Sequence, residues 1–156
     1  AVGAAALMNG RLLPPTFLPR TEAEAAEIGE QVVKESTVEQ MRYLYRLNAE
    51  KGSGKRAEVP GFRVGGKTGT AEKVVNGRYS SDKRFNAFLA AFPMDNPQYI
   101  VLSVIDEPKP EKPGMAATSG LNAAPIVANI IRRSGVLLGV TPEFGHESAA
   151  TVVSYQ

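Results

Sequence analysis

A lysine, two threonines and a glycine stand together at Lys67-Thr68-Gly69-Thr70, inside a longer run from Val59 to Lys73. On one short extended segment, these residues place a positive charge and two hydroxyl groups beside backbone that carries no side chain at the glycine. These residues could bind a ligand that has a carboxylate at one end and a peptide-like backbone behind it, because ammonium and hydroxyl groups both donate hydrogen bonds to carboxylate oxygens. Positions 67–70 are therefore the candidate binding segment.

The same region fits a second pattern, the phosphate-binding P-loop G-x-x-x-x-G-K-T, from Gly61 to Thr68. The apolar run Ile100–Asp106 ends in an acid and could serve as a magnesium-holding strand. A P-loop needs a buried strand before its first glycine and a helix that starts at its lysine. Residues 51–60 are instead polar and loop-like, and a β-rich stretch follows Thr68 as far as the hairpin-type pair Asn76-Gly77. This context argues against a nucleotide site, whose signature would be magnesium-dependent ATP binding.

Composition excludes several other classes. The chain has 156 residues, enough for one domain with a core, and its 43% hydrophobic and 22% charged residues are typical of soluble globular proteins. A net charge of +2 indicates neither a nucleic acid nor an anionic membrane as partner. The absence of cysteine excludes disulfides and thiolate metal sites, and a single histidine, His146, leaves no histidine cluster and no Ser-His-Asp triad. No cofactor is expected, and no apolar run approaches membrane-spanning length.

The first half of the sequence predicts two helices. Residues 1–9 read as the last turns of a helix that stops at Asn9-Gly10, residues 11–18 are extended because prolines interrupt them, and residues 20–35 form a surface helix or loop. Capping-box spacing at Ser36/Glu39 or Thr37/Gln40 predicts that the next helix starts there. Its apolar stripe places Met41, Leu44 and Tyr45 on a core, and Gly52-Ser53-Gly54 ends it.

The second half predicts a sheet. Strands are expected at about 62–75, 84–92 and 99–106, joined by short connections into an antiparallel meander. The second and third are apolar at nearly every position, which favours strands covered on both faces. After a proline-rich loop, Asn122 is expected to cap a final helix with Pro125 in its first turn. The stripe expected to be buried on that helix is Ile126, Val127, Ile130 and Ile131, and residues 140–156 read as a tail. The predicted fold class is α+β, an antiparallel meander covered by helices.

This layout resembles the C-terminal portion of the transpeptidase domain of class B penicillin-binding proteins, which has a β-lactamase/transpeptidase-like fold, over residues 1–139. The third motif of these serine enzymes includes K-T-G. The segments that carry the likeness, in order, are residues 6–16, 52–57, 65–73, 104–108 and 123–127. Thr68 is similar to the division-specific branch rather than the elongation branch, where a serine is usual.

The resemblance implies a mechanism, the cross-linking of peptidoglycan by acyl transfer. A serine would attack the carbonyl between the terminal D-alanines of a stem peptide, and β-lactams would imitate that dipeptide. Lys67 would supply positive charge near the nucleophile, and the Thr68 and Thr70 hydroxyls would hold the substrate carboxylate. The Thr70 N–H would be one oxyanion donor, so Lys67 and Thr70 are the candidate catalytic residues. Gly69 would let the peptide lie along the strand edge.

Two family motifs do not fit in this chain. The nucleophile motif Ser-x-x-Lys should open a buried helix upstream of the lysine strand, whereas Ser80-Ser81-Asp82-Lys83 follows it in an expected polar turn. No Ser-x-Asn triplet, the second motif, occurs. The chain is therefore expected to hold one wall of an active site without the attacking group, as a portion of a longer enzyme.

Several further expectations follow from that hypothesis. The intact domain would bind stem peptides and β-lactams, and its parent would be anchored in the inner membrane with the catalytic domain in the periplasm. Loss of the upstream half would expose apolar surface, which favours pairing with that half or with a second copy. A non-catalytic interaction fragment is the alternative of a different class.

Overall fold

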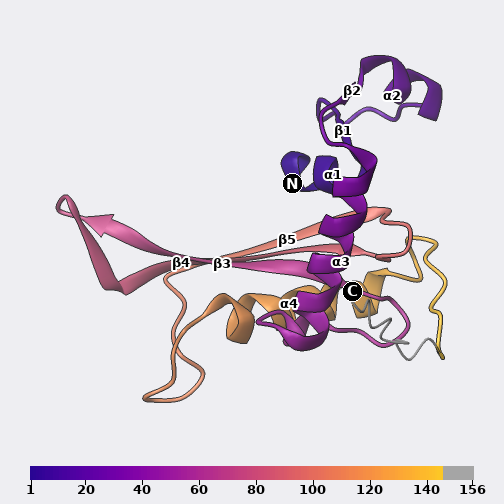
Figure 1. The fold of residues 1–156 in the computed structure, drawn as a ribbon. Helices are drawn as coiled ribbons and strands as arrows, with labels where there is room; N and C mark the ends of the chain where they lie inside the picture. Colours follow the sequence, from indigo (N-terminus) through magenta and orange to yellow (C-terminus); the bar gives the residue numbers. More distant parts are fainter. Residues whose placement is uncertain (146–156) are drawn as a thin grey trace, which may run out of the picture.

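A sheet of three antiparallel strands lies at the centre of the computed structural model, which describes residues 1–145 (Figure 1). The strands are β3 (Gly65–Val75), β4 (Arg78–Phe92) and β5 (Tyr99–Asp106), in the order β3-β4-β5. Each pairs with the next strand along the chain in antiparallel register, with Thr68 opposite Phe88 and Phe88 opposite Ser103. The predicted meander and the α+β class are therefore confirmed.

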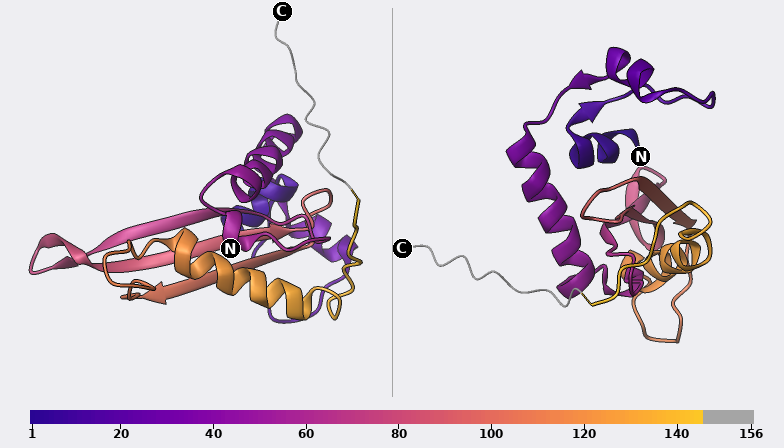
Figure 2. Two further views of the ribbon diagram at one scale, coloured as in Figure 1. Left: turned by 90° about the horizontal axis from the view of Figure 1, so that it is seen from below. Right: turned by 90° about the vertical axis from the view of Figure 1, so that its right-hand side faces the viewer.

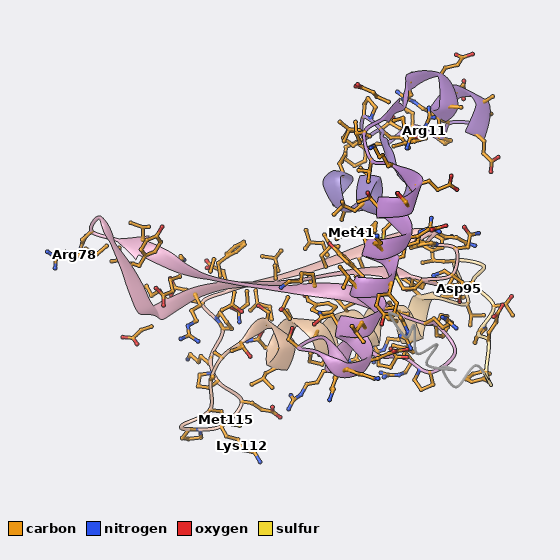
Figure 3. The ribbon with its side chains drawn as sticks, in the orientation of Figure 1. Arg11, Met41, Arg78, Asp95, Lys112 and Met115 are labelled. Carbon is orange, nitrogen blue, oxygen red and sulfur yellow. The ribbon has the colours of Figure 1, made fainter. Side chains whose placement is uncertain are left out.

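The β3–β4 hairpin is longer than predicted. Strand β4 begins at Arg78 rather than near residue 84, and Asn76 and Gly77 form the turn, both with positive φ (51° and 76°). Such left-handed pairs match the twist of the flanking strands and give tight hairpins. The hairpin extends well beyond the rest of the sheet, with Arg78 at its tip (Figure 3). Residues 80–83 lie in this strand, so the predicted polar turn there is wrong, although no helix opens at Ser80.

One face of the sheet packs on helix α4 (Ser119–Ser134), which runs beneath it in Figure 1. Phe88 and Phe92 of β4 have no exposed surface, and Phe92 stacks on Tyr99 at a ring-centroid distance of 5.5 Å. Side chains from α4, from β4, from the segment before β3 and from the segment after α4 complete this core. It comprises Ala57, Val59, Phe62, Val64, Phe88, Ala90, Phe92, Ala123, Ala124, Val127, Ala128, Ile131 and Val140.

The opposite face is covered at one end only. There α1 (Val2–Asn9) and α3 (Glu35–Lys51) lie over the sheet, and Met8 packs with Ala91 and Met94 while Met41 lies against them (Figures 1 and 3). Toward the other end, the apolar side chains of this face are exposed: Phe85 by 44%, Leu102 by 47% and Val104 by 47%. The described residues therefore cover the second face of β4 and β5 only in part, and cover on both faces in the whole domain stays a prediction.

The N-terminal segments form a small unit beside the sheet. Strands β1 (Arg11–Leu12) and β2 (Glu30–Gln31) pair with each other, and α2 (Glu22–Ile28) lies between them in sequence (Figure 2). The left-handed stop predicted after α1 is confirmed, since Gly10 has a φ of 82°. No helix among residues 1–145 is long and apolar enough to cross a bilayer.

The predicted capping boxes of α3 are wrong. That helix begins at Glu35 after Lys34, and no side chain caps it, whereas Thr21 and Glu24 form a capping box at α2. Of the expected stripe, Leu44 is 52% exposed, while Met41 and Tyr45 are partly buried. The buried face of helix α3 is therefore narrower than its apolar pattern predicts, because Leu44 lies outside it.

The predicted start of α4 is also wrong. Thr118 precedes the first residue, so Asn122 lies inside the helix and Pro125 in its second turn. Tertiary partners explain both positions. The side chain of Asn122 accepts a hydrogen bond from Asn86 (3.2 Å), and the Leu121 carbonyl, which Pro125 cannot bond because it lacks an N–H, accepts one from Arg56 (3.2 Å).

The buried face of α4 consists of Ala123, Ala124, Val127, Ala128 and Ile131. Ile126 and Ile130 of the predicted stripe are 41% and 40% exposed. Beyond the helix Val140 packs in the core, and the Glu143 N–H donates to the Gly61 carbonyl (2.8 Å). Residues 146–156, most of the predicted tail, lie outside the described residues, and the division at residue 139 stays a prediction.

We expect Phe88→Ala to lower the free energy of unfolding by about 3–5 kcal/mol, because it removes a fully buried ring from the core beneath the sheet. Phe85→Ala on the same strand is the matched control. Its ring is 44% exposed, so the loss should be about 1 kcal/mol. Urea unfolding of the two variants measures the difference, and equal losses would contradict the assignment of the two faces.

Candidate active site

The binding segment is part of strand β3, so its side chains alternate between the two faces of the sheet. Thr68 and Thr70 lie on the side of α4 and line a groove of about 570 Å³. The groove is lined by Gly52, Ser53, Lys55, Arg56, Thr68, Thr70, Thr118, Gly120 and Leu121. Because Lys67 lies inside a strand and no helix starts there, the P-loop alternative is wrong.

Lys67 is exposed and stands on the opposite face from the two threonines, yet its long side chain reaches back over the strand. Its Nζ donates to the Thr68 carbonyl (2.8 Å) and lies 3.5 Å from Thr68 Oγ1. The structure therefore brings the ammonium group and the first hydroxyl of the motif together. Lys73, farther along β3, is held by Glu107 (2.8 Å) and Asp106 (2.9 Å), and its hydrogen bonds to these carboxylates raise the pKa of Lys73.

The Thr68 hydroxyl is held from the C-terminal end of α3. Thr68 Oγ1 lies 2.9 Å from Ser53 Oγ, in the turn that follows the helix. Asn48 fixes that turn and the strand together: its Nδ2 donates to the Gly66 carbonyl (2.8 Å), and its Oδ1 accepts from the Ser53 N–H (3.1 Å) and Ser53 Oγ (3.2 Å). One side chain of α3 therefore sets the distance between the turn and the motif strand.

The Thr70 hydroxyl is held from the start of α4. Thr70 Oγ1 lies 2.7 Å from Ser119 Oγ and accepts from the Ser119 N–H (3.2 Å). Ser119 Oγ also donates to the Gly69 carbonyl, and the Ser119 side chain is fully buried. The two threonines are thus held by two serines from different helix ends.

A glycine allows these two helix ends to meet. A Cβ at position 120 would lie 2.3 Å from the Ser53 carbonyl oxygen, far closer than any side chain can approach. Gly120 therefore lets the first turn of α4 lie directly against the turn after α3, and residues of both turns line the groove.

Two cations line the groove beside the hydroxyls. Lys55 and Arg56 belong to the short 3-10 turn η1 (Lys55–Ala57). Arg56 Nη1 is shared between the Glu111 carboxylate (3.2 Å) and the Leu121 carbonyl (3.2 Å). With Lys67 at the strand, the groove combines hydroxyl donors and positive charge, which suits an anionic ligand group. Among residues 1–145, no group of three or more carboxylate, histidine or cysteine side chains is placed to hold a metal ion.

Sequence reasoning found the motif strand but missed the residues that hold it. By spacing, Asn48 continues the helical stripe of Met41, Leu44 and Tyr45, and Ser53 is predicted only as part of the helix end. Ser119 lies just before the helix start predicted at Asn122, so nothing marked it as a partner of Thr70. The one available signal was the run Thr118-Ser119-Gly120, in which Ser and Thr are typical of a helix N-terminus.

Fold and groove together define an α+β domain with a hydroxyl-lined groove against the first strand of its meander. Residues 1–132 match the family described as penicillin binding protein transpeptidase domain. The chain belongs to this family.

Curated relatives agree with that assignment. The chain is 43% identical to stage V sporulation protein D of Bacillus subtilis over 112 residues, which are 72% of this chain and 17% of the relative. It is 37% identical to a probable peptidoglycan D,D-transpeptidase FtsI of Caulobacter vibrioides over 145 residues, with 86% of this chain and 25% of the relative covered. The chain thus spans a quarter or less of these two proteins.

Solved structures show the same fold. The transpeptidase domain of penicillin-binding protein 3 from Burkholderia pseudomallei superposes with a TM-score of 0.78 at 29% identity, over 92% of this chain and 43% of that chain. Penicillin-binding protein 3 of Mycobacterium tuberculosis, in a complex with aztreonam, gives a TM-score of 0.66 at 26% identity, over 88% of this chain and 34% of that chain.

We expect two glycines of β3, Gly66 and Gly69, to respond differently to alanine. A Cβ at Gly66 would lie 2.7 Å from the Leu89 carbonyl oxygen and from the Phe88 ring, so Gly66→Ala should lower the free energy of unfolding by about 1–3 kcal/mol. At Gly69 the nearest atoms belong to Ala87 at 3.8 and 3.9 Å, so Gly69→Ala should change it by no more than about 0.5 kcal/mol. Urea unfolding compares them, and a Gly69→Ala loss as large as that at Gly66 would be inconsistent with the open surroundings of Gly69.

Proposed function

We propose that this chain forms one wall of the active site of a serine D,D-transpeptidase, which cross-links peptidoglycan stem peptides and binds penicillin. The observation that carries the proposal is the arrangement on β3: the Thr68 and Thr70 hydroxyls line one groove, and the Lys67 ammonium lies 3.5 Å from Thr68 Oγ1. Membership of the transpeptidase family and curated relatives named as peptidoglycan D,D-transpeptidases support it.

Each residue of the segment has a role in this proposal. Lys67 supplies positive charge beside the nucleophile and the carboxylate of the substrate. The Thr68 and Thr70 hydroxyls donate to that carboxylate, and such charge-assisted hydrogen bonds are about twice as strong as neutral ones. The Thr70 N–H is one of two donors to the oxyanion of the tetrahedral intermediate. Loss of such a donor in other enzymes costs about 3–4 kcal/mol of barrier.

The strand itself is suited to a peptide. In the described sheet β3 is an edge strand, with β4 on one side only, so an extended ligand can add along its outer side by backbone hydrogen bonds. Gly69 is exposed and its surroundings are open, so the ligand can approach the backbone closely there. A larger side chain at this position would occupy that space.

The attacking serine is proposed to come from polypeptide upstream of Ala1. Ser80-x-x-Lys83 fits the nucleophile motif in letters only, because it lies within β4 and begins no helix. The proposed partners of the intact domain are stem peptides that end in D-alanyl-D-alanine, and β-lactams. The relative from Mycobacterium tuberculosis is described in complexes with aztreonam and with ampicillin. The parent is proposed to be anchored in the inner membrane with this domain in the periplasm, where peptidoglycan lies.

We expect the isolated chain to form no covalent adduct with fluorescent penicillin, because no Ser-x-x-Lys motif begins a helix among residues 1–145. Addition of the upstream half of the domain, with its Ser-x-x-Lys helix, should restore a stoichiometric adduct. Gel fluorescence and intact mass measure the adduct in the absence and in the presence of the upstream half. An adduct on the isolated chain would contradict the proposed division of the active site.

In the completed domain, Lys67→Ala should lower the rate of penicillin acylation by roughly 10²-fold or more, because it removes positive charge that faces the reacting groups. Lys73→Ala is the matched control, a lysine on the same strand whose ammonium is held by Asp106 and Glu107. It should leave the acylation rate within about twofold of wild type, as expected for a surface ion pair. Similar losses in both variants would argue against a specific role for Lys67.

A second candidate function is favoured by the exposed apolar side of the sheet. Phe85, Leu102 and Val104 are each more than 40% exposed, so the chain could act as a non-catalytic interaction fragment. Its partner would be the upstream half or a second copy of the chain. Sedimentation with and without the upstream half distinguishes the two candidate functions. A monomer that associates with the upstream half supports the enzyme. A stable dimer that does not dissociate to bind the upstream half supports the interaction fragment.

A further inference from the structure

Ser119 is the first residue of α4, its side chain is fully buried, and it makes three hydrogen bonds with the motif strand. Its Oγ donates to the carbonyl of Gly69. A carbonyl oxygen can only accept, so the single hydroxyl proton of Ser119 is committed to that contact.

The direction of the neighbouring hydrogen bond follows from this. Thr70 Oγ1 lies 2.7 Å from Ser119 Oγ. Because the Ser119 proton already goes to Gly69, the Thr70 hydroxyl must be the donor in this pair. Thr70 Oγ1 also accepts from the Ser119 N–H (3.2 Å). In the structure, therefore, the proton of Thr70 is directed to Ser119 Oγ and is not available to a ligand in the groove while that hydrogen bond holds.

We propose that Ser119 is a positioning residue that competes with the carboxylate of the ligand for the hydroxyl proton of Thr70. The proposal rests on the proposed function, in which Thr70 donates to that carboxylate. For capture, the Thr70 O–H must leave Ser119 Oγ and turn into the groove. Ser119 thereby weakens carboxylate recognition while it keeps the Thr70 side chain in one rotamer.

The partner of Thr68 is arranged in parallel but is less constrained. Ser53 Oγ donates to Asn48 Oδ1 (3.2 Å) and lies 2.9 Å from Thr68 Oγ1, so Thr68 can donate to it in the same way. Ser53, however, is exposed, and its side chain can turn into solvent. Ser119 is enclosed and has no such freedom. The competition is therefore assigned to Ser119, and Ser53 provides the control.

The first measurement follows the Thr70 side chain directly. In the domain completed by its upstream half and labelled at threonine methyl groups, three-bond couplings report the Thr70 χ1 rotamer. Wild type should show one rotamer, Ser119→Ala should show couplings averaged over at least two, and Ser53→Ala should leave Thr70 unchanged. Unaltered Thr70 couplings in Ser119→Ala would overturn the proposal.

The second measurement tests the competition. Ser119→Ala should raise the acylation efficiency of a β-lactam carboxylate by about twofold to tenfold, the equivalent of one neutral hydrogen bond, and should leave that of its methyl ester unchanged. Ser119→Cys, which keeps the shape but accepts hydrogen bonds weakly, should behave like the alanine variant and guards against a folding defect in it.

Slower acylation of Ser119→Ala by the β-lactam with a free carboxylate would overturn the competition. An equal change in acylation by the methyl ester would overturn it too. If the wild-type completed domain takes up no β-lactam at all, the proposed function fails. The Thr70 couplings still decide then whether Ser119 holds the threonine.

Discussion

Two backbone carbonyls of strand β3 are bound by side chains from two different helix ends, and the rest of the groove depends on these contacts. Asn48 of α3 donates to the Gly66 carbonyl, and Ser119 of α4 donates to the Gly69 carbonyl. Both side chains bond the strand where glycine leaves the backbone accessible. The motif is thus fixed through its own backbone. Ser119 also holds the Thr70 hydroxyl, whereas Asn48 acts on the Thr68 hydroxyl only through Ser53.

The strand and its motif could be predicted from sequence because they depend on local features. Hydroxyl and β-branched residues around Lys67 favour an extended segment, Asn76-Gly77 requires a tight turn, and short connections leave an antiparallel meander as the simple solution. The extended form of positions 67–70 and the fold class followed from these features.

The helix boundaries and the residues that support the groove could not be predicted, because distant partners decide them. Asn122 is a good capping residue by type, yet its side chain bonds Asn86 from β4. Leu44 fits an apolar stripe by spacing but is 52% exposed, since periodicity does not say how wide a face the sheet covers. Ser119 holds Thr70 across 49 residues of sequence, and no local pattern reports such a pair.

Pro125 in the second turn of α4 has an effect beyond the helix. Because a proline nitrogen carries no hydrogen, the Leu121 oxygen remains available, and the Arg56 guanidinium occupies it at 3.2 Å. The backbone hydrogen bond that α4 lacks at Pro125 therefore determines where Arg56, a cation of the groove wall, binds. Any residue with an N–H at position 125 could donate to that oxygen, and Glu111 would then be the remaining partner of the Arg56 guanidinium described here.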